Sequence, residues 1–127
     1  MTNNNLSSNV NLFLGLQCQF KIMHWQTKGY ARHQAFGNIY DALDDLVDKY
    51  VEVSMGKFGR FTIDESNRNI EIYNLLDIDI VKFIQKIKEI LIGLSTELSP
   101  ENDTDLLNIR DEMLAEVNKL AYLLTLE

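Results

Sequence analysis

The chain has 127 residues, of which 46 % are hydrophobic and 24 % are charged, a balance typical of one folded domain rather than a disordered segment. With a formal net charge of −7 and no cluster of Lys and Arg, the chain lacks the electrostatic surface that phosphate backbones require, so no nucleic-acid partner is expected. One cysteine, no secretion signal and no apolar run of the about 20 residues that cross a bilayer favour a cytoplasmic protein without a membrane role.

A helical fold is indicated by the scarcity of chain-breaking residues, because only one Pro and six Gly are present. Residues 1–8 are polar and are expected to fray, with Ser8 or Asn9 as the helix cap. The first helix is predicted at about 9–28, and it ends before Gly29. One domain spanning residues 1–127 follows.

This first helix carries apolar residues on two sides. One stripe at helical spacing consists of Phe13, Leu16, Phe20 and Met23. A second stripe consists of Leu14, Cys18, Ile22 and Trp25. A helix that is apolar on two sides needs two neighbours, so a partner is expected on each side.

The second helix is predicted at about 33–55, and its apolar stripe includes Phe36, Leu43 and Tyr50. At about 100° per residue, the acids Asp41, Asp45, Asp48 and Glu52 lie roughly 140° to 200° away from Leu43. These carboxylates therefore face away from the core.

The remaining chain is predicted as a long crossover over residues 56–77, with a short strand or turn, and two further helices. Asp77 is expected to cap a third helix over about 78–98, and Ser99 with Pro100 marks the start of the last one. Two helices joined tightly, a long crossover, and two more helices joined tightly give an up-down-down-up four-helix bundle, the connectivity of ferritin-like proteins. The predicted fold class is therefore all-α.

Both histidines of the chain bracket the corner between the first two helices. His24 ends one helix and His33 begins the next, while Asp48 and Glu52 lie one turn apart on the second helix. Imidazole and carboxylate together suit iron or zinc better than calcium or magnesium. No acid precedes Asp41, so the first helix cannot supply a carboxylate ligand.

The run from His24 to Gly29 (HWQTKG), followed by His33, Asp48 and Glu52, resembles the HW-x-x-K-G…H…D-x-x-x-E signature of the Dps-like mini-ferritins. It also resembles short ferritin-like proteins of unassigned function encoded by phages and other viruses, for which the location would be the host cytoplasm. The resemblance covers about residues 13–59, and the gap from His24 to His33 is shorter than the family pattern.

The resemblance implies a metal site between subunits. In that family, two histidines of one chain face an Asp and a Glu from the second helix of its mate, which implies His24 and His33 of one copy and Asp48 and Glu52 of another as iron ligands. It also implies a homodimer or a larger homo-oligomer with possible ferroxidase activity, iron storage or a role in oxidative protection. The Lys/Arg-rich tail that many members use on DNA is missing.

Other interpretations stay open at this point. His24 can be a hydrogen-bonded structural residue, His33 a polar residue at a helix start, and the acids a solvated helix face. A second hypothesis is accordingly a non-enzymatic helical scaffold or interaction protein without metal, and a third is a structural metal bridge at a dimer interface without turnover.

Overall fold

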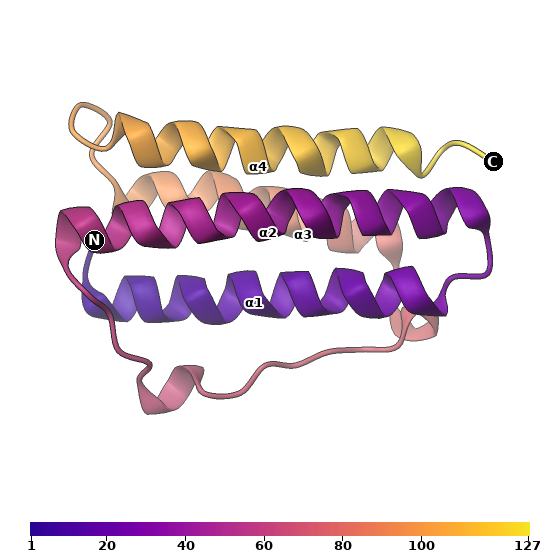
Figure 1. Cartoon of the computed structure of the whole chain (residues 1–127), viewed down its shortest axis with the longest axis horizontal. Coiled ribbons are helices and arrows are strands. Elements are labelled where there is room, and N and C mark those ends of the chain that lie inside the picture. The colour runs from indigo at the N-terminus through magenta and orange to yellow at the C-terminus, as the bar shows by residue number, and fades with distance from the viewer.

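The computed structural model describes all 127 residues and contains four α-helices that pack as a bundle (Figure 1). They are α1 (Asn3–Gln26), α2 (Tyr30–Phe58), α3 (Ile80–Gly93) and α4 (Thr104–Leu123). In Figure 1, α1 and α4 run in one direction and α2 and α3 in the other, because the crossover between α2 and α3 returns along the bundle before α3 begins. The expected all-α four-helix bundle is confirmed.

The first helix begins earlier than the sequence predicts, at Asn3, so the expected start at about residue 9 with Ser8 or Asn9 as the cap is wrong. Thr2 caps α1: its side chain accepts the backbone N–H of Asn5, and the Asn5 side chain accepts the backbone N–H of Thr2. Leu6 and Ser7, 2 % and 0 % exposed, are buried in the first turns. Reciprocal capping satisfies two otherwise unpaired N–H groups, and buried Leu6 supplies packing energy to the same turns.

The other helix ends differ by a few residues from the prediction: α2 spans Tyr30–Phe58 instead of about 33–55, and side-chain hydrogen bonds account for the starts of α3 and α4. Asp79, rather than Asp77, caps α3 by accepting the N–H of Lys82. This helix stops at Gly93 and continues as a 3-10 turn over Leu94–Glu97. The last helix begins at Thr104 and not at Pro100, because the Asp103 carboxylate accepts the Ser99 N–H at 2.7 Å and holds the intervening residues in a turn.

The core lies between the four helices and contains the expected apolar stripes. Phe13 packs its ring edge against Tyr50 with centroids 5.4 Å apart, which joins α1 to α2. Phe20 stacks with Phe36 of α2 and meets Phe83 of α3 edge-on, so that aromatic contacts connect three helices. No helix is both long and apolar enough to cross a lipid bilayer.

The crossover contains no strand and is held to α1 by side chains. It includes two short 3-10 turns, Glu65–Asn67 and Leu75–Asp77, and passes along the outer side of α1 (Figure 1). Polar side chains of α1 hydrogen-bond to its backbone at successive points: Asn3 to Thr62, Ser7 to Asp64, Asn11 to Asn67 and Asn69, Gln19 to Tyr73, and Gln26 to Leu75. We call these five side chains the polar ladder. The polar ladder supplies hydrogen-bond partners to backbone N–H and C=O groups of the extended crossover, which a neighbouring β-strand would supply in a sheet.

Candidate functional site

The imidazole rings of His24 and His33 form a stacked pair at the α1–α2 turn. Their centroids are 3.8 Å apart and their planes differ by 19°. Nδ1 of His24 lies 2.7 Å from the carbonyl oxygen of His33, and Nδ1 of His33 lies 2.8 Å from the carbonyl oxygen of His24. Each ring thus binds the backbone of the other residue.

These contacts determine which ring nitrogen carries the proton. A carbonyl oxygen only accepts hydrogen bonds, so each Nδ1 must be the donor. In the neutral imidazole the lone pair then lies on Nε2, and Nε2 makes no hydrogen bond in either residue. This is the tautomer that metal-ligating histidines adopt when a backbone carbonyl orients them.

The stacking itself limits how the pair can bind a metal. An imidazole donates its lone pair in the plane of its ring, at about 2.0–2.1 Å from the metal. Two planes that differ by 19° and stand 3.8 Å apart at the ring centres do not meet within that distance. In this arrangement one ion can therefore bind only one of the two rings.

The expected carboxylate ligands lie far from the histidines within one chain. His33 and Asp48 are both on α2, and the fifteen residues between them correspond to about 22 Å along the helix axis. Asp48 and Glu52 are both exposed and make no ion pair or hydrogen bond within the chain. The chain brings no three His, Cys, Asp or Glu side chains together in a cluster that could hold a metal ion. The four predicted ligands thus divide into a histidine pair and a carboxylate pair.

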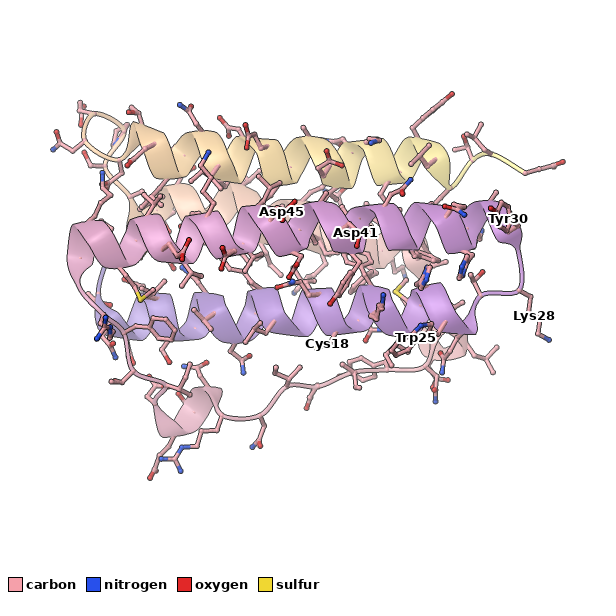
Figure 2. The ribbon with its side chains drawn as sticks, in the orientation of Figure 1. Cys18, Trp25, Lys28, Tyr30, Asp41 and Asp45 are labelled. Carbon is pink, nitrogen blue, oxygen red and sulfur yellow. The ribbon has the colours of Figure 1, made fainter.

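Three of the four residues in the second apolar stripe of α1 are left exposed by the bundle, and the fourth, Ile22, is half-buried. Trp25 is 64 % exposed, Leu14 is 44 % exposed, and Cys18 is also exposed. We call the surface that these residues form with the adjacent side of α2 the α1–α2 face; it consists of Leu14, Cys18, Lys21, Trp25, Tyr30, Asp41, Asp44, Asp48 and Glu52. Figure 2 labels Cys18 and Trp25 along α1 and Asp41 along α2. No other element of the same chain covers these three side chains of α1.

Two features give the α1–α2 face its shape. The Lys21 ammonium lies 4.5 Å from the ring centre of Tyr40 and 5.6 Å from that of Trp25, so a cation–π contact orients the indole. Further along the face a cavity of about 230 Å³ opens between the two helices. Its walls are Val10, Leu14, Gln17, Asp44, Val47, Asp48 and Val51.

A larger cavity lies elsewhere, between α1, the crossover and α3, and has a volume of about 630 Å³. Gln19 and Tyr73, which join α1 to the crossover, line it together with Lys86. Neither histidine nor any of the predicted carboxylate ligands lines it, so this cavity is separate from the histidine pair.

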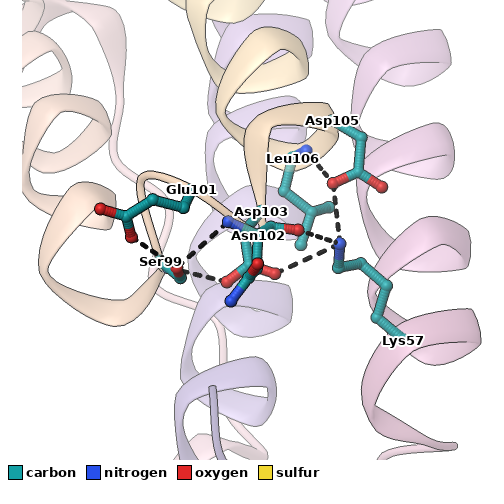
Figure 3. A network of polar contacts seen from close by, with 7 residues as sticks. All are labelled: Lys57, Ser99, Glu101, Asn102, Asp103, Asp105 and Leu106. Atoms are coloured by element: carbon teal, nitrogen blue, oxygen red, sulfur yellow. Dashed lines mark hydrogen bonds and ion pairs between the residues drawn. The ribbon is translucent and has the colours of Figure 1, made fainter.

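A polar network that the sequence did not predict joins α2 to the start of α4 (Figure 3). The Lys57 ammonium lies 2.9 Å from Asp105 and 3.2 Å from Asp103, and it donates to the carbonyl oxygen of Asn102. The hydrogen bond from the Ser99 N–H, together with Lys57, lowers the pKa of Asp103; the bond from Lys57 lowers the pKa of Asp105. The bond to Asp105 in turn raises the pKa of Lys57. The network has the character of a structural tie, and an Asp directly before a helix was its only signal in the sequence.

These observations define a small all-α protein, a four-helix bundle with one uncovered helical face and a histidine pair at its edge. Residues 24–124 match the sequence model described as "Family of unknown function (DUF5856)", and the chain belongs to that family. It is 30 % identical to the "Uncharacterized 14.6 kDa protein in mobD-ri intergenic region" of Enterobacteria phage T4 over 116 residues, which are 91 % of this chain and 84 % of the phage protein. The expected relation to a phage protein is therefore confirmed.

No solved structure matches the chain. Neither the family nor the phage protein is described as a ferritin. The ferritin-like assignment consequently rests on the motif around His24 and on the order of the helices.

Proposed function

We propose that this protein is an iron-binding homo-oligomer in which each metal ion lies between two copies, in the manner of the Dps-like mini-ferritins. The observation that carries the proposal is the pair of backbone-oriented histidines, each with an unused Nε2. Asp48 and Glu52 complement them, because both carboxylates are exposed and unpaired. A ferrous ion bound to one imidazole and two carboxylates would have its charge neutralised by the ligands.

A twofold arrangement of two chains supplies what one chain lacks. If α2 of one copy runs antiparallel to α2 of the other, His33 comes level with Asp48 and Glu52 of the mate. Halfway between these positions lie Asp41 and Ala42, so the twofold axis would cross α2 there. Each dimer then has two equivalent sites.

The stacked rings specify the form of the site. Because one ion binds only one of the two rings in the observed arrangement, the first iron would take one imidazole together with the carboxylates of the mate. A second imidazole joins the same ion only if its ring leaves the stack and gives up its Nδ1 hydrogen bond. Open coordination positions would admit dioxygen or hydrogen peroxide, the oxidant that a ferroxidase reaction requires.

Metal content after anaerobic loading with Fe(II) tests the proposal. The variants are His24→Ala with His33→Ala, and Asp48→Ala with Glu52→Ala; the control is Asp111→Ala with Glu112→Ala, which removes two exposed acids of α4. Mass spectrometry should find stoichiometric iron in the wild type and in the control, and little in the two site variants.

Mixing the two site variants tests whether the ligands come from different copies. After the chains exchange, each mixed dimer contains one site with all its ligands, so part of the iron binding should return. If the mixture binds no more iron than either variant alone, the shared site is wrong. Loss of iron binding in the control would instead indicate unspecific binding to surface acids.

A metal-free helical scaffold or interaction protein is the second candidate, and the stacking of His24 and His33 favours it. Each ring already donates a hydrogen bond to a backbone carbonyl group at the α1–α2 turn, and these bonds do not require a metal. In this case the wild type binds no iron, and the site variants keep the oligomeric state. Binding of iron or zinc that promotes dimerisation without Fe(II) oxidation would instead indicate a structural metal bridge.

A further inference from the structure

The α1–α2 face contains both a protruding aromatic side chain and a hollow, and they lie at opposite ends of it. Trp25 is 64 % exposed near the α1–α2 turn. The cavity of about 230 Å³ lies beside Leu14, eleven residues earlier on α1, which is about 16 Å along the helix. Within the chain, no side chain fills the cavity, and the only contact described for the indole is that of Lys21 with its ring. A protrusion and a hollow on one surface fit each other in a second copy if the two copies are related by a twofold rotation.

The positions of the histidines and carboxylates indicate the same axis independently. The midpoint between Trp25 and Leu14 lies on α1 between residues 19 and 20. Contacts between the helices relate this level to α2: Lys21 lies over the ring of Tyr40, and Gln17 donates to Asp44. Residues 19 and 20 of α1 are therefore level with residues 41 and 42 of α2. The twofold axis that pairs His33 with Asp48 and Glu52 of the mate crosses α2 at the same level.

The charges of the face agree with this pairing. Lys28 lies at the Trp25 end, whereas Lys21 lies close to the expected axis, and no acid occurs before Asp41. Asp44 and Asp48 line the cavity at the other end. Antiparallel docking brings Lys28 of one copy toward the Asp44 and Asp48 end of its mate, whereas parallel docking would place like charges together. Asp41 is the exception, because it lies at the axis and would stand near Asp41 of the mate.

We propose that Trp25 of each copy inserts into the cavity between α1 and α2 of a second copy, so that two reciprocal insertions form a symmetric dimer. Leu14 and Val51 would contact the faces of the indole, and Asp44 or Asp48 would accept its N–H. The cation–π contact with Lys21 orients the ring before docking and lowers the entropy lost on binding. This inference rests on the self-association in the proposed function, and the proposed metal ligands support only the position of the axis.

The experiment uses the full chain in chelator-treated buffer and follows self-association by analytical ultracentrifugation together with the fluorescence of Trp25, which is the only tryptophan. The wild type should dimerise, and its emission maximum should shift to shorter wavelength as the dimer forms. Trp25→Ala should raise the dissociation constant by about thirtyfold or more, the effect of removing an aromatic anchor at an interface. Val51→Asp should do the same from the cavity side and leave the emission at the solvent-exposed wavelength.

Tyr122→Ala is the matched control, because Tyr122 is an equally exposed aromatic residue, 63 % exposed, on α4. It should leave the dissociation constant unchanged. Cys18, the only cysteine, lies near the expected axis, so a short bis-maleimide should cross-link two copies through it.

A dimer that cross-links through Cys18 but keeps solvent-exposed tryptophan emission, and that Trp25→Ala does not weaken, would overturn the insertion and leave the shared face intact. A protein that stays monomeric throughout the concentration series, with or without iron, would overturn both the insertion and the intersubunit site. A dimer with buried Trp25 that binds no iron would support the insertion and contradict the metal.

Discussion

The His33 side chain donates a hydrogen bond to a carbonyl group at the end of the preceding helix, and this bond explains the geometry of the histidine pair. The last four carbonyl groups of a helix have no partner in the next turn, and the carbonyl of His24 is one of them in α1. The His33 ring donates to it, while the His24 ring donates to the spare lone pair of the His33 carbonyl. The sequence placed both residues at the corner, but the stacking depends on the course of the three residues of the turn, for which no periodic pattern exists.

Gly37 leaves the space in which the His24 ring lies, and this can be tested by substitution. A Cβ atom at Gly37 would stand 3.0 Å from two atoms of that ring, whereas a Cβ at Gly56 in the same helix would meet nothing within 4 Å. Because Ala favours helix over Gly by about 1 kcal/mol, Gly56→Ala should raise the free energy of unfolding. The free energy of unfolding of Gly37→Ala, measured by urea denaturation, should be lower than that of Gly56→Ala by about 1 kcal/mol or more. Equal gains in the two variants would contradict the close approach.

Tyr50 presents a buried hydroxyl without a hydrogen-bond partner. The residue is fully buried, and burial raises the pKa of its phenol. Since an unpaired buried hydroxyl is destabilising, Tyr50→Phe should raise the free energy of unfolding by about 1 kcal/mol while keeping the edge contact with Phe13. Tyr40→Phe, at a half-buried position, should be close to neutral. A clear loss of stability in Tyr50→Phe would mean that the hydroxyl binds an internal water.

At the scale of the elements, the helices were predictable because their apolar residues repeat at helical spacing. The helix ends and the path of the crossover were not predictable, because single side-chain hydrogen bonds determine them. The stripes of Phe13 and Leu43 follow the helical period, so the existence and core sides of the helices were predictable. The ends were less so, because Asp103 reaches back to Ser99 and thereby moves the start of α4 beyond Pro100. The apolar residues of the crossover do not repeat at a regular spacing. Its path is determined by hydrogen bonds between its backbone and side chains of α1, and such bonds require no repeating pattern of apolar residues.

The polar ladder can be tested at Gln19, which is buried and binds both the N–H and the C=O of Tyr73. Gln19→Glu keeps the size of the side chain but removes the donor to the Tyr73 carbonyl. The crossover should then open more often, and trypsin should cleave after Arg68 about tenfold faster. The control is Gln85→Glu, an exposed position on α3. An unchanged cleavage rate would show that the ladder does not hold the crossover in place.

The Lys57 network predicts an acid-sensitive tie between α2 and α4. Because the folded state lowers the pKa of Asp103 and Asp105, their stabilising contribution is complete above the ordinary value of 3.8 and is lost as the pH falls through the folded values. The pKa of Lys57 is raised from its ordinary value of 10.5, so its stabilising contribution is complete at every pH below that value. The lysine and both carboxylates are therefore charged at neutral pH.

Thermal unfolding as a function of pH measures this tie. Wild-type stability should decline between about pH 5 and about pH 2 more steeply than that of Lys57→Met, which has already lost the ion pairs. Lys119→Met is the control, since Lys119 pairs only with Glu116 at 3.9 Å on the surface of α4. Parallel pH profiles for the wild type and Lys57→Met would exclude a role of the network in acid stability.

Across the whole molecule, charge is distributed unevenly, and self-association should reflect this. The chain has no acid before Asp41, while the far end of the α1–α2 face carries Asp44, Asp48 and Glu52. Added salt screens attraction between such ends, with a Debye length that falls from about 30 Å at 0.01 M to about 3 Å at 1 M. The dissociation constant of the dimer should therefore rise several-fold with sodium chloride in sedimentation equilibrium. A constant that falls with salt would indicate that screening of the repulsion between two chains of net charge −7 outweighs the attraction between these ends.

The sequence also indicated that α1 needs a second neighbour, from the stripe that contains Leu14 and Trp25. Leu14, Cys18 and Trp25 of that stripe are exposed in the single chain, and Ile22 is half-buried. The identity of the neighbour could not be derived, because periodicity reveals a face and not what covers it. The cavity beside Leu14 became apparent only when α1 and α2 were placed side by side.

The way in which the crossover is attached bears on how the chain can vary. The polar ladder binds the main chain of residues 62–75, which every amino acid shares, so most side chains there can be exchanged without cost to the fold. Proline is the exception at Thr62, Asp64, Tyr73 and Leu75, because these residues donate a backbone N–H that proline lacks. The crossover can therefore acquire new surface chemistry through substitution while its path along α1 stays the same.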